Sequence, residues 1–522
     1  MGVELRDYQR QAVEAIEREW HEGRDRTLLV QATGTGKTVV FGQVARDVVD
    51  SGSRVLVLAH REELLAQASD KLGGMYGLDC SLEMAGSHDG GSSVLLGSVQ
   101  TLGRDNRLAA FAPDEFGAVI VDEAHHTLAN SYMKIIEHFR LAYLLGVTAT
   151  PDRGDKRALG KVYDSIAYEY GLARAVNDGY LCRIVAKTVP LEIDARALKE
   201  SHGDFTLNSA GAVVEVKLDD IADAIAREAC DRHTVVFLPL VQIAKDMAEK
   251  LRERGMHAEE VDGESADRKE VIARFESGQT QVLCNAMLLT EGWDAPICDC
   301  VVVLRPTKVR SLYAQMVGRG TRPHHGKENL LLLDFLWMTG EHRLCAPASL
   351  VAESDDEQQR MARRDGDILE SQEEVKRDIL AEREAALAEQ LAQMRKQKSK
   401  SVDVVQYELS IGSESLANYE PQFAWEFLEP TEKQLAYLEK MGVATDGLMR
   451  GKAVALMDVM MQRQRAGMAT PKQVRCLEKY GFLHPGMWSF EEANRVIGRL
   501  SAAKWKPWAA GINPKTYVPE GR

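Results

Sequence analysis

The sequence predicts an α/β fold with two parallel-sheet domains in tandem, followed by an α-helical C-terminal region. From residue 1 to about 345, short Val-, Ile- and Leu-rich runs alternate with amphipathic stretches, which is typical of buried parallel strands joined by helices. The expected strands are 27–31, 54–59, 94–97, 118–121 and 144–148, then 234–238, 281–285, 300–304 and 330–334. A break near residues 170–179 separates the two series and predicts two domains.

The helical region is predicted from composition and from an internal repeat. Residues 354–400 are dense in Glu, Arg, Ala, Gln and Leu with no Pro, which favours a long helix or helical hairpin. Segment 431–442, TEKQLAYLEKMG, aligns with segment 470–481, TPKQVRCLEKYG. Each copy begins with Thr and ends with Gly, the residues preferred at helix N- and C-termini. We therefore expect four parts: domains 1–172 and 173–350, a helical spacer 351–424, and a small helical repeat module 425–522.

Composition limits the class of protein. The chain has 522 residues, of which 45% are hydrophobic and 28% charged, as in ordinary globular proteins. It has no apolar run of the ~20 residues that a membrane helix needs, and no signal-peptide pattern at its start. Its eight cysteines lack the paired spacing of a zinc site, so a reducing, cytoplasmic compartment is expected without a membrane partner.

The C-terminal module differs in charge from the rest of the chain. Residues 431–522 carry 15 Lys and Arg against 8 Asp and Glu, a net charge of +7, whereas the whole chain carries −14. This asymmetry favours contact with nucleic acid, and a solvated basic face is the alternative. Lys433–Gln434 and Lys472–Gln473 are expected near helix N-termini that attract phosphate. The indoles of Trp488, Trp505 and Trp508, which lie among Lys and Arg, either stack on bases or pack in a core.

A glycine-rich segment at residues 31–38, QATGTGKT, follows a predicted strand and precedes a predicted helix. Such a loop directs backbone N–H groups at phosphates, with Lys37 on the β- and γ-phosphates and the Thr38 hydroxyl on Mg²⁺. Gln31 stands where the strict pattern has glycine, so a simple glycine-rich turn is the alternative for this segment alone. The expected nucleotide contacts here are Thr33, Gly34, Thr35, Gly36, Lys37 and Thr38.

An acidic pair ends the predicted strand in residues 118–126, AVIVDEAHH. Asp122 is expected to hold Mg²⁺, and Glu123 to orient and deprotonate the water that attacks the γ-phosphate. A buried strand that ends in two carboxylates needs a cation to neutralise them. This pair therefore strengthens the prediction of a nucleotide site.

Two arginines in the second α/β domain are candidates for the same site. In residues 315–322, QMVGRGTR, Arg319 and Arg322 are three apart and share one helix face. They are expected to act as arginine fingers on the nucleotide held by the first domain. A solvated helix carrying two arginines is the alternative.

Taken in order, these segments resemble the conserved motifs of superfamily 2 helicases. The resemblance is to the branch with the motor subunits of type I and type III restriction enzymes and related repair and prophage helicases, and it covers about residues 3–335. The matching segments are LRDYQ at 5–9, AHREEL at 59–64, GSVQTL at 97–102, DEAH at 122–125, GVTATP at 146–151, LTEGWDAP at 289–296 and QMVGRGTR at 315–322. It implies two RecA-like P-loop domains that use ATP and Mg²⁺.

The resemblance also implies residue roles. Gln9 would contact the adenine, Gly292 and Asp294 the nucleotide, and Gln315 would join the catalytic set with Lys37, Asp122, Glu123, Arg319 and Arg322. Arg61, Ser98, Gln100 and Thr101 would hold the nucleic-acid backbone. His125 and His126 would couple hydrolysis to movement rather than bind a metal.

The function expected from this resemblance is that of an ATP-dependent DNA helicase or translocase. RNA as the partner stays open. So does a second class of protein, an ATP-switched nucleic-acid-binding or remodelling subunit of a restriction or repair complex, with protein partners on the C-terminal helices. The sequence has no nuclease signature of spaced Asp and Glu-x-Lys and no methyltransferase glycine loop, which argues against a self-contained restriction enzyme.

Overall fold

A computed structural model describes residues 3–519 of the chain apart from several short stretches. The stretches outside the description are 61, 85–87, 89–90, 150–158, 195–197, 202–203, 263–266, 287–292, 294, 339–343, 363, 395–403, 412, 414–415, 417–418, 420, 422, 515 and 518. The chain divides into two compact units, Met1–Val375 and Lys376–Arg522. Within the described residues, no helix is both long enough and apolar enough to cross a membrane.

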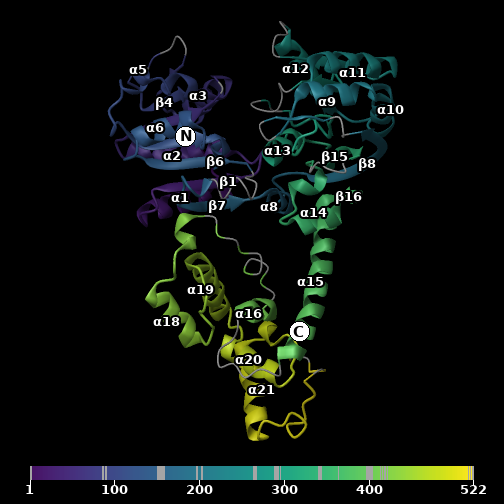
Figure 1. The fold of residues 1–522 in the computed structure, drawn as a ribbon. Helices are drawn as coiled ribbons and strands as arrows, with labels where there is room; N and C mark the ends of the chain where they lie inside the picture. The colour runs from purple at the N-terminus through teal and green to yellow at the C-terminus, as the bar shows by residue number, and fades with distance from the viewer. Residues whose placement is uncertain are drawn as a thin grey trace. The chain divides into compact units, whose positions relative to one another are not determined.

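The first sheet has seven strands in the order β3-β4-β2-β5-β6-β1-β7, and all neighbouring strands are parallel (Figure 1). Its strands are β1 Arg26–Gln31, β2 Arg54–Ala59, β3 Cys80–Glu83, β4 Val94–Ser98, β5 Phe116–Asp122, β6 Tyr143–Thr148 and β7 Ser165–Tyr170. The helices of this part are α1 Asp7–His21, α2 Lys37–Asp50, α3 Glu62–Tyr76, α4 Val99–Leu102, α5 Asp105–Leu108, α6 Asn130–His138 and α8 Leu172–Asn177.

Both faces of this sheet are buried, which explains its continuous apolar strands. In β1, Leu29 packs in a cluster with residues of α1, α2 and α3. The preceding residue, Leu28, packs with residues of α4, α5 and α6. Successive side chains of a strand point to opposite faces, so a strand covered on both sides must be apolar throughout. Because all strands are parallel, β1 and β5 end at the same edge of the sheet.

The second sheet also has seven strands, in the order β12-β13-β11-β14-β15-β8-β16. Only β16 is antiparallel to its neighbour. The strands are β8 Arg183–Asp194, β11 Thr234–Phe237, β12 Ala258–Val261, β13 Val282–Asn285, β14 Cys300–Val303, β15 Asn329–Met338 and β16 Gly366–Asp367. The helices are α9 Leu207–Glu215, α10 Leu218–Glu228, α11 Val241–Glu253, α12 Arg268–Glu276, α13 Arg310–Gly318 and α14 Asp355–Met361. A short hairpin, β9 Glu200–Ser201 and β10 Asp204–Phe205, precedes α9.

The second unit is helical. After α15 Ile368–Met394, in which the division between the units falls, its helices are α16 Val404–Ser410, α18 Glu432–Met441, α19 Arg450–Arg465, α20 Pro471–Lys479 and α21 Phe490–Ala502. Residues of α16, α18 and α19 share one apolar cluster, and residues of α20 and α21 share another. Each copy of the sequence repeat therefore contributes a helix to a separate apolar core.

The repeat owes its regularity to helix capping. Thr431 accepts a hydrogen bond from the Gln434 N–H, and Gln434 Oε1 accepts from the Thr431 N–H. Thr470 and Gln473 form the same reciprocal pair, a capping box. Gly442 ends α18 in the left-handed conformation at φ 87°, as expected. Lys433, Gln434, Lys472 and Gln473 lie in the first turns of α18 and α20, as expected, and phosphate binding at these helix ends stays a prediction.

The fold class predicted from the sequence is confirmed. All nine expected strands are present, and the long helix expected in residues 354–400 is α15, preceded by α14. The sequence did not predict β3, β7, β8 and β12, nor the two-residue strands β9, β10 and β16. The proposed division at residues 172, 350 and 424 stays a prediction.

Candidate nucleotide site

The glycine-rich loop lies between β1 and α2, at the carboxyl edge of the first sheet. Gly34 and Gly36 adopt φ values of 89° and 85°, a left-handed conformation that residues with a side chain rarely adopt. Lys37 is the first residue of α2, and Thr38 follows in the first turn. The backbone N–H groups at this helix end have no partner inside the helix, which suits them to phosphate oxygens.

The Thr35 carbonyl anchors this loop from inside the domain. It accepts hydrogen bonds from Tyr8 Oη at 2.7 Å, Gln31 Nε2 at 2.9 Å and Gln9 Nε2 at 3.2 Å. Gln31, which departs from the strict glycine pattern, is thus a fully buried brace. Its contribution could not be deduced from the sequence, because it depends on a loop that folds back over the strand end.

Gln9 is also buried and joined to the loop. Its Oε1 accepts from the Arg6 N–H at 3.0 Å, and a Cβ built on Gly36 would lie 2.8 Å from its Nε2. Both ends of the Gln9 amide therefore have protein partners, and its contact with adenine stays a prediction.

The acidic pair stands at the end of β5, facing the loop. Glu123 Oε1 accepts from Lys37 Nζ at 3.2 Å, and the Glu123 N–H donates to Asp122 Oδ1 at 3.0 Å. Glu123 has a φ of 51°, an uncommon conformation for a residue with a side chain, and such strain is concentrated at functional sites. The structure thus brings together Lys37, Asp122 and Glu123.

The electrostatics keep Glu123 ionised and His125 neutral. Burial by itself would raise the pKa of Glu123, but the Lys37 ammonium holds it below its usual value. Burial lowers the pKa of His125 to about 4, although Glu123 opposes this shift; His125 Nδ1 lies 3.4 Å from Glu123 Oε2. An ionised carboxylate beside a neutral imidazole is suited to accept a proton from water.

The second domain brings its arginine segment to the loop. The prediction that Arg319 and Arg322 share one helix face is wrong, because α13 ends at Gly318 and both arginines follow it. A Cβ built on Gly318 would lie 2.7 Å from Thr33 Cβ, and one built on Gly34 would lie 3.5 Å from Arg322 Cγ. Gln315 is buried on α13. Arg319 Nη1 donates to the Trp293 carbonyl at 2.5 Å, so the two arginines differ: the stem of Arg322 lies against the loop, and Arg319 binds its own domain.

The predicted strand contacts lie beside a row of histidines that the sequence did not single out as a group. Gln100 Nε2 donates to the His60 carbonyl at 2.7 Å, and Ser98 Oγ donates to Gln100 Oε1 at 2.8 Å. The His60 ring lies 4.7 Å from the His126 ring, which lies 4.1 Å from the His125 ring. A continuous set of contacts therefore runs from Glu123 to Gln100.

Five further residues are predicted to contact nucleic acid or nucleotide. Ser98 and Thr101 are buried, and their contact with a nucleic-acid backbone stays a prediction. Arg61, Gly292 and Asp294 lie outside the described residues.

The site fits a nucleoside triphosphate and its Mg²⁺. Glu123 Oε2 and Thr33 Oγ1 are buried without a hydrogen-bond partner, a costly arrangement in a protein interior that a bound water or ligand would relieve. Thr38 and Asp122 supply the oxygen ligands that Mg²⁺ prefers. Fold and site together define a P-loop nucleotide-binding protein with two α/β domains.

Comparisons with known proteins identify the family. Residues 2–153 match the family described as Type III restriction enzyme, res subunit, and residues 216–324 match the Helicase conserved C-terminal domain. The chain is 33% identical over 378 residues to Putative ATP-dependent helicase IRC3 of Saccharomyces cerevisiae, covering 67% of this chain and 54% of that protein. It thus spans about half the length of this relative.

Two solved structures resemble the fold. A fragment of a putative HsdR subunit of a type I restriction enzyme from Vibrio vulnificus YJ016 is 26% identical, with a TM-score of 0.51 over 63% of each chain. The Type ISP restriction-modification enzyme LlaBIII, solved bound to DNA, is 16% identical, with a TM-score of 0.53 over 98% of this chain and 43% of that one.

The chain belongs to superfamily 2 of the helicases, and it is related to the motors of restriction enzymes. Its two sheets are the RecA-like domains that this resemblance implied.

Proposed function

We propose that this protein hydrolyses ATP with Mg²⁺ and uses the cycle to move on nucleic acid, as a DNA helicase or translocase. The observation that carries the proposal is the meeting of three elements at one edge of the first sheet. The loop before α2 and the acid pair after β5 are joined by the Lys37–Glu123 contact, and the end of α13 lies against the same loop.

Each side chain then has a defined task. Lys37 and the loop N–H groups bind the phosphates, while Thr38 and Asp122 hold Mg²⁺, which supplies charge neutralisation at the phosphates when bound. Glu123 orients water and accepts its proton. Arg322, with Arg319, stabilises negative charge on the transferred phosphoryl group.

Coupling to movement follows from the two-domain arrangement. A triphosphate that contacts both the loop and Arg322 favours the closed pair of domains, and loss of the γ-phosphate removes that bridge. The histidine row from His125 through His126 to His60 is the path by which we expect this change to reach Gln100.

DNA is the partner we favour. The relatives that support it are the HsdR fragment and LlaBIII, the second of which is described as bound to DNA. Contacts to the backbone should be tolerant of sequence and sensitive to salt. The buried thiols of Cys298 and Cys300 fit the reducing, cytoplasmic compartment that the sequence predicts.

The tail offers a surface for single strands. Trp488 is buried in the module core, but Trp505 is 39% and Trp508 77% exposed. Lys506 Nζ lies 5.6 Å from the centre of the Trp508 ring, and Tyr480 stacks on Trp505 at 5.2 Å. Exposed aromatic rings among lysines are suited to stack on unpaired bases. We propose this Tyr480–Trp508 patch as an accessory nucleic-acid contact.

The proposal is tested by measuring ATP turnover with single-stranded DNA, duplex DNA and RNA side by side. We expect DNA to raise turnover at least tenfold above the rate without nucleic acid, and more than RNA does. If only RNA stimulates turnover, RNA is the partner instead of DNA. If no nucleic acid changes the rate of turnover, the proposal is wrong.

A further inference from the structure

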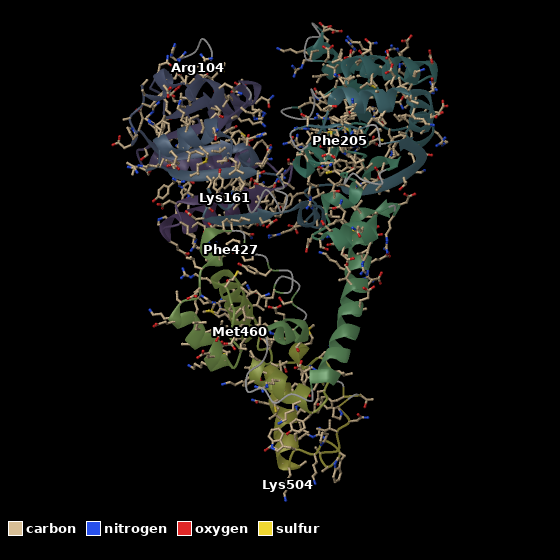
Figure 2. All side chains as sticks on the ribbon, in the orientation of Figure 1. Arg104, Lys161, Phe205, Phe427, Met460 and Lys504 are labelled. Atoms are coloured by element: carbon tan, nitrogen blue, oxygen red, sulfur yellow. The ribbon has the colours of Figure 1, made fainter. Side chains whose placement is uncertain are left out.

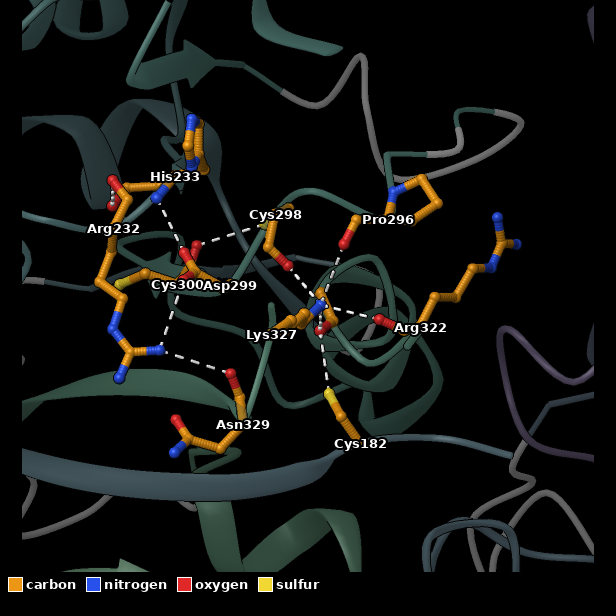
Figure 3. A network of polar contacts seen from close by, with 12 residues as sticks. Cys182, Arg232, His233, Pro296, Cys298, Asp299, Cys300, Arg322, Lys327 and Asn329 are labelled. Carbon is orange, nitrogen blue, oxygen red and sulfur yellow. Dashed lines mark hydrogen bonds and ion pairs between the residues drawn. The ribbon is translucent and has the colours of Figure 1, made fainter. Parts of the chain in front are cut away.

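The loop between α13 and β15 contains a lysine whose ammonium lies in a cage of backbone carbonyls (Figure 3). Lys327 Nζ lies 2.5 Å from both the Cys298 and the Gly320 carbonyl oxygens, 2.9 Å from that of Arg322 and 3.3 Å from that of Pro296. An ammonium has three hydrogens, so four carbonyls share them and enclose the charge.

This lysine has no carboxylate partner among the described residues. Asp299, the acid nearest in sequence to the cage, accepts instead from the His233 N–H at 2.8 Å and from Arg232 Nη1 at 3.4 Å. Burial accordingly lowers the pKa of Lys327. A half-buried cation without a carboxylate partner is costly, so the four carbonyls must offset the water that the ammonium loses.

The caged carbonyls belong to two segments of the second domain, one of which, at the end of α13, lies against the phosphate-binding loop. Gly320 and Arg322 follow α13, which ends at Gly318. Pro296 and Cys298 end the segment that begins at Trp293, whose carbonyl binds Arg319. Two side chains therefore join these segments: Arg319 binds the Trp293 carbonyl, and Lys327 binds carbonyls of both segments.

The position of Arg322 depends on this connection. Its carbonyl is held by Lys327, while its side-chain stem lies against Gly34 of the phosphate-binding loop. On the other side of Arg322, the Thr321 carbonyl accepts from the Cys182 N–H at 2.7 Å. The backbone that carries the arginine is thus fixed at two successive carbonyls.

We propose that Lys327 is a positioning residue for ATP hydrolysis, which holds the backbone of Arg322 so that its guanidinium meets the transferred phosphate. This inference rests on the proposed role of Arg322. Loss of Lys327 should therefore lower the rate of ATP turnover but not the affinity for ATP. The cage belongs to the second domain, whereas most of the proposed phosphate contacts belong to the first.

The first experiment compares kcat and KM for ATP in Lys327→Met, which keeps an apolar stem of similar length without the charge. A displacement of about 1 Å in a catalytic group costs up to about 10²-fold in rate. We therefore expect kcat to fall between tenfold and a hundredfold, with KM changing less than threefold. Lys245→Ala, at a lysine of the same domain paired with Asp262, is the control and should keep wild-type turnover.

The decisive experiment is chemical rescue of Lys327→Ala with n-propylammonium chloride, which matches the atoms that this substitution removes. We expect the added cation to restore at least a third of the lost kcat in Lys327→Ala and none in Lys327→Met, whose side chain fills the space. Sodium chloride at equal ionic strength and n-propanol should not restore it. A merely structural role would change the unfolding temperature without this specific rescue.

Wild-type kcat in Lys327→Ala, or a loss that propylammonium leaves unchanged, would overturn the inference. If Lys327→Ala does not fold, the kcat and KM of Lys327→Met decide: wild-type kcat overturns it, and a selective loss of kcat supports it. Normal turnover in Arg322→Ala would instead refute the proposed function of the arginine. Loss of turnover in Arg322→Ala but not in the Lys327 variants would refute the inference alone.

Discussion

Lys37 and Glu123 contact each other across the site, so replacing either one changes the surroundings of the other. Glu123→Gln keeps the shape and leaves Asp122 in place for Mg²⁺. We expect it to bind ATP while nucleic-acid-stimulated hydrolysis falls by about 10²- to 10⁴-fold, the usual contribution of a general base. Lys37→Ala should instead weaken nucleotide binding. Equilibrium binding of a fluorescent ATP analogue and phosphate release measure the two effects, and near-normal turnover in Glu123→Gln would refute the assigned base.

The two arginines of the second domain make a separate prediction. Arg322→Ala should lower hydrolysis by roughly 10³-fold, the scale of an arginine finger, and lower ATP affinity much less because the first domain supplies most phosphate contacts. Arg319→Ala should also lower hydrolysis, since it loses the contact with the Trp293 carbonyl. Single-turnover hydrolysis measures both variants. A wild-type rate of hydrolysis in both variants would show that neither arginine takes part in hydrolysis.

His125 gives the folded protein a defined sensitivity to acid. Its pKa is lowered by burial from 6.5 to about 4, and its side chain is 15% exposed. Between these two values the unfolded chain takes up a proton that the folded chain does not. The free energy of unfolding therefore falls as pH falls through this window, by up to about 3 kcal/mol for this one group.

Urea unfolding at pH 7 and pH 5 without nucleotide tests this prediction. His125→Gln should lose less stability than the wild type between the two values, because glutamine does not titrate. His21→Gln, at an exposed position of α1, is the matched control. An unchanged pH dependence in His125→Gln would show that this imidazole is not held neutral by burial.

The strands that the sequence predicted are those whose burial on both faces requires a run of apolar residues. Strands β1, β2, β5 and β6 are covered on both faces, so each contains a run of mostly apolar residues that is visible in the sequence. Strands β3 and β12 stand at sheet edges, and the polar residues in CSLE and AEEV conceal them.

The candidate site shows the same limit. Spacing within the chain was enough to place the loop and the acid pair, because each is a local pattern at a strand end. The Gln31 brace, the histidine row and the lysine cage join residues that are distant in sequence or meet only in the fold. Such contacts arise from backbone geometry that no single segment contains, so one sequence without its fold could not reveal them.

The Tyr480–Trp508 patch carries the prediction for the C-terminal module. Lys504, labelled in Figure 2, and Trp505 have φ values of 52° and 60°, an unusual turn for two successive residues with side chains. Trp508→Ala should weaken binding to single-stranded DNA by about 1 to 3 kcal/mol, the value of one base-stacking contact. Lys504→Ala combined with Lys506→Ala should flatten the salt dependence of binding.

Fluorescence anisotropy over a range of salt concentrations measures both effects, with saturated ATP turnover as the reference that should stay unchanged. Phe427→Ala, at another exposed aromatic residue of the second unit, is the control. If affinity and salt slope are the same in all variants, the module is a docking site for protein rather than a nucleic-acid contact.

For the whole molecule, we propose that ATP hydrolysis at the first domain's sheet edge drives movement along nucleic acid rather than a change of affinity for it. Two sheets alone do not distinguish these functions, because both a motor and an affinity switch close on ATP. They differ in what one round of hydrolysis leaves behind: a motor has advanced along the strand, whereas a switch has only released it.

The most direct measurement is displacement of a labelled strand from a partial DNA duplex, followed in real time with a trap that prevents rebinding. We predict displacement that requires ATP and Mg²⁺, continues over several turnovers from one binding event, and disappears in Glu123→Gln while that variant stays bound. A triple-helix-forming strand placed on the duplex reports translocation without strand separation. DNA-stimulated hydrolysis that displaces neither strand would contradict the claim and identify the chain as an ATP-dependent affinity switch.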